Sequence, residues 1–288
     1  MLAYQFTLSD PDLLRGAKRI ALEQVKRALA HIEQPSLPQP EAVHELRKHA
    51  KRLRALVRLI RTAAADPTTM DALDTHLRDA ARAVAHLRDA DVLHATLAAL
   101  SPADLPRLSA ALARPRAPAL SAPEALAACH AQLTHAKRAL KSLPTSGDTG
   151  AILHEGLAKT YARARHAQRA ALTQTGAARL HDWRKCVKDH LYQARLLTPI
   201  WPALMLPHAE ATEELAERLG DLNDLAVFRA TLATLDLPAS ERTTVDARIT
   251  TLKARHQLAA FPLGARLFVE HPNDLARRWG RLWDIWRA

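Results

Sequence analysis

The sequence predicts an all-α protein, because it is rich in helix-forming residues and poor in the residues that sheets need. Of its 288 residues only 8 are glycine and 4% are aromatic, whereas 48% are hydrophobic, with alanine and leucine abundant. Strands favour β-branched and aromatic residues, and hairpins favour glycine in their turns. The hydrophobic share is large enough to build a folded core, which argues against a disordered chain.

Helix breakers divide the first half of the chain. Helices are predicted over residues 10–33 and 41–65, on either side of the loop QPSLPQP. Asp66 and Pro67 are typical of an N-cap followed by the first helical position, so a third helix is predicted to begin there, and it could reach Leu100. Ser–Pro and Ala–Pro steps then mark shorter elements, a loop over 113–123 and a helix over 124–141.

The stretch LPTSGDTG, residues 143–150, is the predicted linker, because it combines Pro, Ser, Thr, Asp and two Gly at the midpoint of the chain. It separates a first helical half, residues 1–142, from a second, residues 151–288. Helices in the second half are predicted over 151–173, 177–198, 208–235, 239–259 and 273–287. The last one is an appended helix whose three tryptophans have the spacing of a packing face: Trp279, Trp283 and Trp286.

The two halves resemble each other, which indicates an internal duplication. The segment 43–48 with Lys51 matches 180–185 with Lys188 at an offset of 137 residues. The segment 87–92 matches 222–227 at an offset of 135. Matches that keep the same order at nearly the same offset are typical of a repeated helical unit.

One predicted helix carries cations on the side opposite its apolar residues. On a helical wheel the basic residues at 47, 48, 51 and 58 lie within about 60° of His44, and Leu46, Leu53 and Leu56 lie on the other side. Seven basic residues and no acidic one stand between Glu45 and Asp66. Exposed helix faces usually mix charges, because like charges one turn apart repel. The second copy repeats the stripe, so two basic faces are predicted to share one polyanionic ligand.

The motif V-H-x-L-R-K-x-x-K-R-L-R at 43–54, its degenerate copy L-H-x-W-R-K-x-x-K at 180–188 and L-R-D-x-D-V at 87–92 resemble the CHAD domain, the conserved histidine α-helical domain. The resemblance runs from the first helix to about residue 260. It implies two pseudo-symmetric four-helix bundles around a basic central groove, which together form one CHAD domain. It also implies that inorganic polyphosphate binds in that groove and that the protein associates with polyphosphate granules.

Carried over residue by residue, the resemblance assigns polyphosphate binding to both motif helices and, more weakly, to the first helix of each half. The residues of the first motif helix are His44, Arg47, Lys48, Lys51, Arg54 and Arg58, and those of the second are His181, Arg184, Lys185, Lys188 and Arg195. The weaker candidates are Arg19, Lys159 and Arg163. The second copy departs from the pattern at KDHLY, where it loses two cations, and at Asn223, which stands where the first half has Arg88.

Three other functions stay open from the residues. The net charge of +11 would attract nucleic acid nonspecifically, although the basic stripes lack the interleaved aromatic residues that single strands stack on. A histidine beside a basic groove could accept a phosphoryl group in a phosphotransfer or phosphatase reaction, but no phosphate-binding loop or carboxylate cluster accompanies it. Metal binding is disfavoured by cationic neighbours and poor histidine spacing, so we expect no metal, no cofactor and no catalysis. Asp89 and Asp224 are expected to pair with arginines across the bundle.

The two cysteines, Cys129 and Cys186, form no metal or disulfide motif. No apolar stretch is long enough to cross a membrane and no secretory signal is visible, so a cytoplasmic protein with no membrane partner is expected. If His44 and His181 bind phosphate as imidazolium, affinity should rise as the pH falls through about 6.5.

Overall fold

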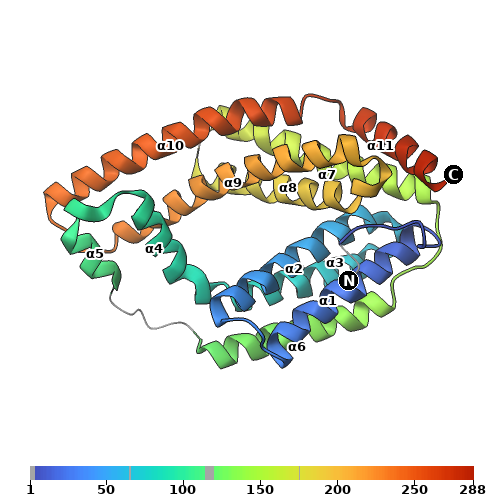
Figure 1. Cartoon of the computed structure of the whole chain (residues 1–288), viewed down its shortest axis with the longest axis horizontal. Coiled ribbons are helices and arrows are strands. Elements are labelled where there is room, and N and C mark those ends of the chain that lie inside the picture. Colours follow the sequence, from blue (N-terminus) through green and yellow to red (C-terminus); the bar gives the residue numbers. More distant parts are fainter. Residues whose placement is uncertain (1–3, 65, 114–119, 175) are drawn as a thin grey trace.

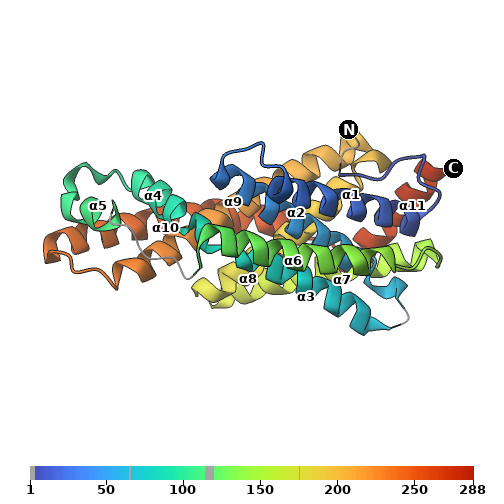
Figure 2. The same ribbon diagram turned by 90° about the horizontal axis from the view of Figure 1, so that it is seen from below.

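In the computed structural model of this chain, the described residues are 4–64, 66–113, 120–174 and 176–288, and they form helices and no strand. The fold class predicted from composition is therefore confirmed. The helices group into a lower and an upper layer in Figure 1, and a smaller unit lies at one end of the molecule. The smaller unit and the C terminus lie at opposite ends in both views (Figures 1 and 2).

The lower layer contains four helices that pack in a ring. These are α1 (Leu13–Glu33), α2 (Gln39–Leu59), α3 (Pro67–Ala83) and α6 (Ala122–Lys141), and each contacts the next, with α6 returning to α1. Side chains cap several of them as the sequence predicts: Asp66 accepts a hydrogen bond from the backbone N–H of Thr68 at 2.9 Å at the start of α3.

The upper layer contains α7 (Thr149–Thr173), α8 (Ala177–Leu196), α9 (Pro202–Leu232), α10 (Ala239–Leu267) and α11 (Pro272–Arg287). In this layer α8 packs on α7 and α9, α9 packs on α10, and α11 packs on α7. The packing face predicted on the last helix is confirmed, because two of its tryptophans are almost fully buried, Trp279 and Trp283.

The two layers meet where α2 contacts α7 and α8, so the two motif helices pack against each other. Gly156 of α7 lies directly on the backbone of α2, and a Cβ atom added there would stand 1.9 Å from the carbonyl oxygen of Leu59. Gln193 of α8 donates a hydrogen bond to the carbonyl oxygen of Ala55 at 3.2 Å. A glycine thus lets α7 approach α2 closely, and a hydrogen bond from a side chain to the backbone joins the two basic helices α2 and α8.

The third predicted helix does not continue to Leu100. It ends at Ala83, and a 3₁₀ turn, η2 (His86–Arg88), separates it from α4 (Asp89–Ala99). Val84 is fully buried at this break, whereas His86 and Arg88 are only partly buried. The break redirects the chain away from the lower layer and places Arg88 between the two layers. No glycine or proline lies at this break, so the helical pattern of the sequence gives no sign that the helix ends there.

The smaller unit is held together by its own core. Helices α4 and α5 (Pro106–Ala113) pack there against the end of α9 and the start of α10, through Leu97, Leu108, Phe228 and Val245 among others. Arg248 of α10 binds Asp104 with a bidentate ion pair at 2.7 and 2.8 Å. These contacts join segments that lie far apart in the sequence, so they fix the end of α9 beside α4.

Several predicted boundaries differ from the observed ones. Helix α7 begins at Thr149, inside the predicted linker 143–150, and α9 begins at Pro202 rather than at 208. Helix α10 continues to Leu267 rather than ending at 259. Helix α9 contains Pro207 and α10 contains Pro262, so both helices run through a proline, which usually interrupts a helix. Most of the loop predicted over 113–123 lies outside the described residues. Among the described residues, none of the helices combines the length and apolar character that a membrane crossing requires.

Candidate functional site

A cavity of about 940 Å³ lies between the two layers and receives side chains from α2, α8 and α9 and from the η2–α4 segment. Among the described residues, seven lysines and arginines and four carboxylates line it. The cations are Arg47, Lys48, Lys51, Arg88, Arg184, Lys188 and Arg195. Uncharged residues of α4 and of the end of α9 line the remaining wall: Val92, Leu93, Val227, Ala230, Thr231 and Thr234.

Four of these cations make neither an ion pair nor a side-chain hydrogen bond with any described residue. Among the described residues, no carboxylate lies within ion-pair distance of Arg47, Lys51, Arg184 or Lys188, and none of these four side chains makes a hydrogen bond. They come from α2 and α8 in equal number. We call them the unpaired cluster. All four were predicted from the sequence as binding residues, and the fold brings them together.

The four positive charges of the unpaired cluster repel one another. Burial, together with the charges of Arg184, Arg47, Lys188 and Arg88, lowers the pKa of Lys51 to about 8. Burial and the charge of Arg184 also lower the pKa of Lys188, although Glu213 works against that shift. The protonated form of Lys51 is therefore disfavoured in the free protein, and a bound anion would remove that penalty.

Arg184 reaches the cavity because α9 has a glycine beside it. The guanidinium lies over Gly220, where an added Cβ atom would stand 3.3 Å from Nη2. The Nε atom of Arg184 is buried and has no hydrogen-bond partner. A side chain on α9 at this position would press against the guanidinium, so Gly220 gives Arg184 its room.

Of the remaining cations of the cavity wall, Lys48 and Arg195 have carboxylate partners, whereas Arg88 contacts His44. Lys48 binds Glu45 one turn earlier on α2 at 3.0 Å, and Arg195 of α8 binds Glu213 of α9. The prediction that Asp89 and Asp224 pair with arginines is wrong, because neither carboxylate of the described structure lies within ion-pair distance of a cation. Both carboxylates line the cavity instead. Asp89 lies at the start of α4, directly after η2, and Asp224 lies on α9.

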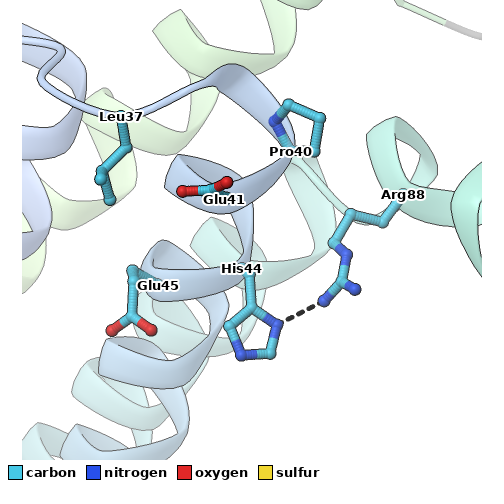
Figure 3. Close-up of a pocket in the computed structure, with 6 residues that line it drawn as sticks. All are labelled: Leu37, Pro40, Glu41, His44, Glu45 and Arg88. Carbon is cyan, nitrogen blue, oxygen red and sulfur yellow. Dashed lines mark hydrogen bonds between the residues drawn. The ribbon is translucent and has the colours of Figure 1, made fainter.

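His44 and Arg88 lie together at one edge of the cavity (Figure 3). The Nδ1 atom of His44 accepts a hydrogen bond from the Arg88 guanidinium. Partial burial and the charge of Arg88 lower the pKa of His44 below its usual value. Both side chains also line a second cavity of about 470 Å³, together with Leu37, Pro40 and Glu41 among others. The pair thus stands between the two cavities.

In the second half the residues that match this pair are also in contact. The ring of His181 lies 2.7 Å from the amide oxygen of Asn223, and Nδ1 of His181 donates this hydrogen bond. Asn223 lines the larger cavity, but His181 does not. Lys185 is exposed, binds Asp182 at 2.6 Å, and does not line the cavity either. Two of the predicted residues of α8 therefore lie outside it.

Arg54 and Arg58 of α2 also lie away from the cavity and are held by carboxylates. Both bind Asp74 of α3, with N–O distances of 2.9 and 3.1 Å. Arg58 also binds Asp189 of α8 at 2.7 Å, and Asp189 is almost fully buried. Asp189 is one of the positions where the second copy departs from the motif. Its carboxylate joins the two layers, which explains why an acid stands there.

A model of the CHAD domain family matches residues 19–233 of this chain. The chain belongs to the CHAD domain family. The crystal structure of the CHAD domain from the plant Ricinus communis is similar to it, with 21% sequence identity and a TM-score of 0.49, over 97% of this chain and 93% of that one. No curated protein matches the sequence.

The weaker candidates on the first helix of each half lie outside the cavity of this CHAD domain. Arg19 binds Asp10 with two short hydrogen bonds, one of them at 2.7 Å from Nη2 to Oδ2. Lys159 binds Glu155 on its own helix, and Arg163 lies 3.6 Å from the buried Asp189. Arg19 thus binds the segment that precedes α1, Lys159 binds its own helix, and Arg163 lies near a carboxylate of the neighbouring helix α8.

Sequence reasoning missed several residues of the CHAD cavity. Arg88 and Asp89 line the cavity and belong to the motif L-R-D-x-D-V, so this motif could have identified them as site residues. Glu213 and Glu217 follow one another by a helical turn on α9, but no sequence pattern connects them with the cations of α8. Among the described residues no group of three or more histidine, cysteine or acidic side chains is arranged to hold a metal ion.

Proposed function

We propose that this CHAD domain binds inorganic polyphosphate in the larger cavity without transforming it, and that this binding associates the protein with polyphosphate granules. The observation that carries the proposal is the unpaired cluster. Arg47, Lys51, Arg184 and Lys188 converge there, and among the described residues no carboxylate lies within ion-pair distance of any of them. The CHAD family's association with polyphosphate supports the same ligand.

Polyphosphate suits such a cluster for physical reasons. Every unit of the chain is charged, and it offers no base or sugar to recognise. Arginine binds phosphate oxygens through two parallel N–H groups, and lysine contributes a point charge. An anion that enters the cavity replaces repulsion among the four cations with attraction. Relief of the repulsion among these cations therefore contributes to the free energy of binding.

We further propose that α2 and α8 form two equivalent walls of a duplicated basic groove. Two pairs of matched contacts and one pair of matched positions support this. His44 contacts Arg88 as His181 contacts Asn223, and each histidine belongs to a motif helix. Arg58 of α2 binds a carboxylate of the following helix, and so does its match on α8, Arg195. Lys51 and Lys188 both line the cavity.

Nonspecific binding of nucleic acid is the main alternative. The unpaired cluster lies in a cavity between helices, where a single flexible chain can enter more easily than a duplex. We expect long polyphosphate to bind more tightly than duplex DNA of equal charge or orthophosphate when all three are titrated at about 0.15 M salt. Stronger binding of the duplex would overturn the proposal. Release of orthophosphate, or phosphorylation of His44, would contradict the absence of catalysis.

Binding of polyphosphate is also expected to weaken steeply with salt. If the four cations of the cluster each neutralise one phosphate, affinity should fall about 50- to 150-fold between roughly 50 and 200 mM salt, because counterions are released on binding. The measurement is a series of titrations at several salt concentrations. Affinity that does not change with salt would contradict an electrostatic site.

The pH dependence of affinity is expected to reflect Lys51 above neutrality. Its pKa of about 8 in the free protein should rise when phosphate binds, so binding takes up a proton above that pH. Affinity should therefore be constant from about pH 7 to 8 and then fall, by up to about tenfold per pH unit.

The matched control for this pH profile is Lys51→Gln. Its affinity should be lower at neutral pH and should fall less steeply above pH 8, and any remaining slope comes from Lys188, whose pKa is also lowered. An unchanged slope in Lys51→Gln would assign the titration to another group. A further rise of affinity below about pH 6.5 would assign a separate contribution to the histidines.

A further inference from the structure

We propose that Lys51 is a modification site at which small acyl phosphates transfer their acyl group to the side-chain amine. The reaction takes place in the free protein, and Lys51 differs from the neighbouring lysines in its contacts. Lys48 and Lys185 lie on the same two helices, but each binds a carboxylate, at 3.0 and 2.6 Å. Lys51 has no such partner among the described residues and lines the larger cavity.

The surroundings of Lys51 favour its uncharged form. With a pKa of about 8, about half of this side chain is free amine at pH 8, whereas an ordinary lysine is almost entirely protonated there. Only the free amine is a nucleophile. Lys51 therefore combines a reactive amine with access from the cavity.

The same surroundings favour a phosphorylated reagent over other acylating agents. Arg47 and Arg184 line the same cavity as Lys51, and the charges of both guanidinium groups contribute to the lowered pKa of the amine. They can bind the phosphate group of an acyl phosphate and leave the acyl carbon facing Lys51. The cations would also stabilise the phosphate as it leaves.

The reaction balances without another reagent. The amine nitrogen of Lys51 attacks the acyl carbon, and a C–N bond forms as the C–O bond to phosphate breaks. The nitrogen loses its proton to the departing group, which leaves as hydrogen phosphate. The product is an amide on Lys51, which carries no charge. If polyphosphate is the ligand of this cavity, as the proposed function holds, acylation removes one cation of the unpaired cluster and weakens binding.

The test measures acetylation of the full chain by acetyl phosphate, with mass spectrometry of each lysine. Lys51 is expected to react at least tenfold faster than Lys185, with a rate that rises through about pH 8. Acetic anhydride, which carries no phosphate, should show a smaller preference for Lys51. Added inorganic phosphate should slow the reaction of Lys51 with acetyl phosphate and leave Lys185 unchanged.

Two variants separate guidance by the cluster from intrinsic reactivity. Arg184→Gln should reduce the preference of acetyl phosphate for Lys51, and the matched control Arg277→Gln, an exposed cation of α11, should not. Equal rates at Lys51 and Lys185, faster reaction at Lys188, or no protection by phosphate would overturn the proposal. These measurements use no polyphosphate, so their failure is distinguishable from failure of the proposed function.

Discussion

Replacing Arg47, Lys51 and Arg184 with glutamine in one variant is expected to weaken polyphosphate binding about a thousandfold and to raise the melting temperature of the free protein. A hydrogen bond to a charged group contributes about 1.5–3 kcal/mol, and about 1.4 kcal/mol is a factor of ten in affinity. The three side chains come from both α2 and α8, so their loss weakens both walls of the cavity.

The expected gain in stability of the free protein follows from the pKa of Lys51. Folding lowers this pKa from 10.5 to about 8, so the folded protein holds the proton less well than the unfolded chain. The resulting penalty is fully present below about pH 8 and disappears as the pH rises towards 10.5. At neutral pH the variant lacks this penalty, and its melting temperature should rise by roughly a few degrees. Calorimetry and titration with polyphosphate measure both effects.

The matched control removes the same net charge elsewhere. Lys159, Lys185 and Arg277 are exposed, and each binds a carboxylate of its own helix. Replacing these three with glutamine should change affinity only a few-fold through long-range attraction. Equal losses in both variants would mean that net charge, rather than the cluster, binds the ligand. A lower melting temperature in the first variant would mean that the cluster stabilises the fold.

The helical fold and the central cations could be predicted because they depend on local sequence. Apolar spacing places Leu46 and Leu53 inward on α2, and the same spacing places Arg47 and Lys51 on another side. The repeat then predicts Arg184 and Lys188 on α8 without any knowledge of the packing. For these residues the helix period alone decides which way the side chain faces.

The difference between Arg47 and Arg58 could not be predicted in this way. Both lie on the predicted cationic side of α2, but Arg58 meets Asp74 of α3 and Asp189 of α8, which lie 16 and 131 residues away in sequence. Only the packing of the two layers brings those carboxylates to Arg58. The break before Arg88 is likewise a tertiary effect, since Val84 is buried there and no breaker residue precedes it.

Replacing Arg58 with alanine is expected to destabilise the fold by about 3–5 kcal/mol and to leave polyphosphate affinity of the folded protein nearly unchanged. Arg58 is the closest cation to Asp189, at 2.7 Å, and both side chains are largely buried, with 17% and 9% exposed. Removing one partner of a buried ion pair leaves the other charge without compensation. Denaturant unfolding gives the loss in free energy, and titration of the folded variant gives the affinity.

The matched control is Arg163→Ala, which removes a more distant and more exposed cation from the same carboxylate. Arg163 is 50% exposed and lies 3.6 Å from the other oxygen of Asp189. Its loss should cost about 1 kcal/mol or less. A large loss of affinity in Arg58→Ala without a loss of stability would instead make Arg58 a binding residue, as the sequence motif alone predicts.

The pH dependence of the Arg58→Ala variant provides an independent check on the cause. Burial already raises the pKa of Asp189 in the intact protein, and loss of its closest cation should raise it further. A carboxyl group whose pKa is higher in the folded state binds more protons there, so folding becomes more favourable as the pH falls. The deficit of the variant relative to the intact protein should therefore shrink as the pH falls from neutrality. Asp189→Asn combined with Arg58→Met should recover much of the lost stability, because no unpaired charge is then left between α2 and α8.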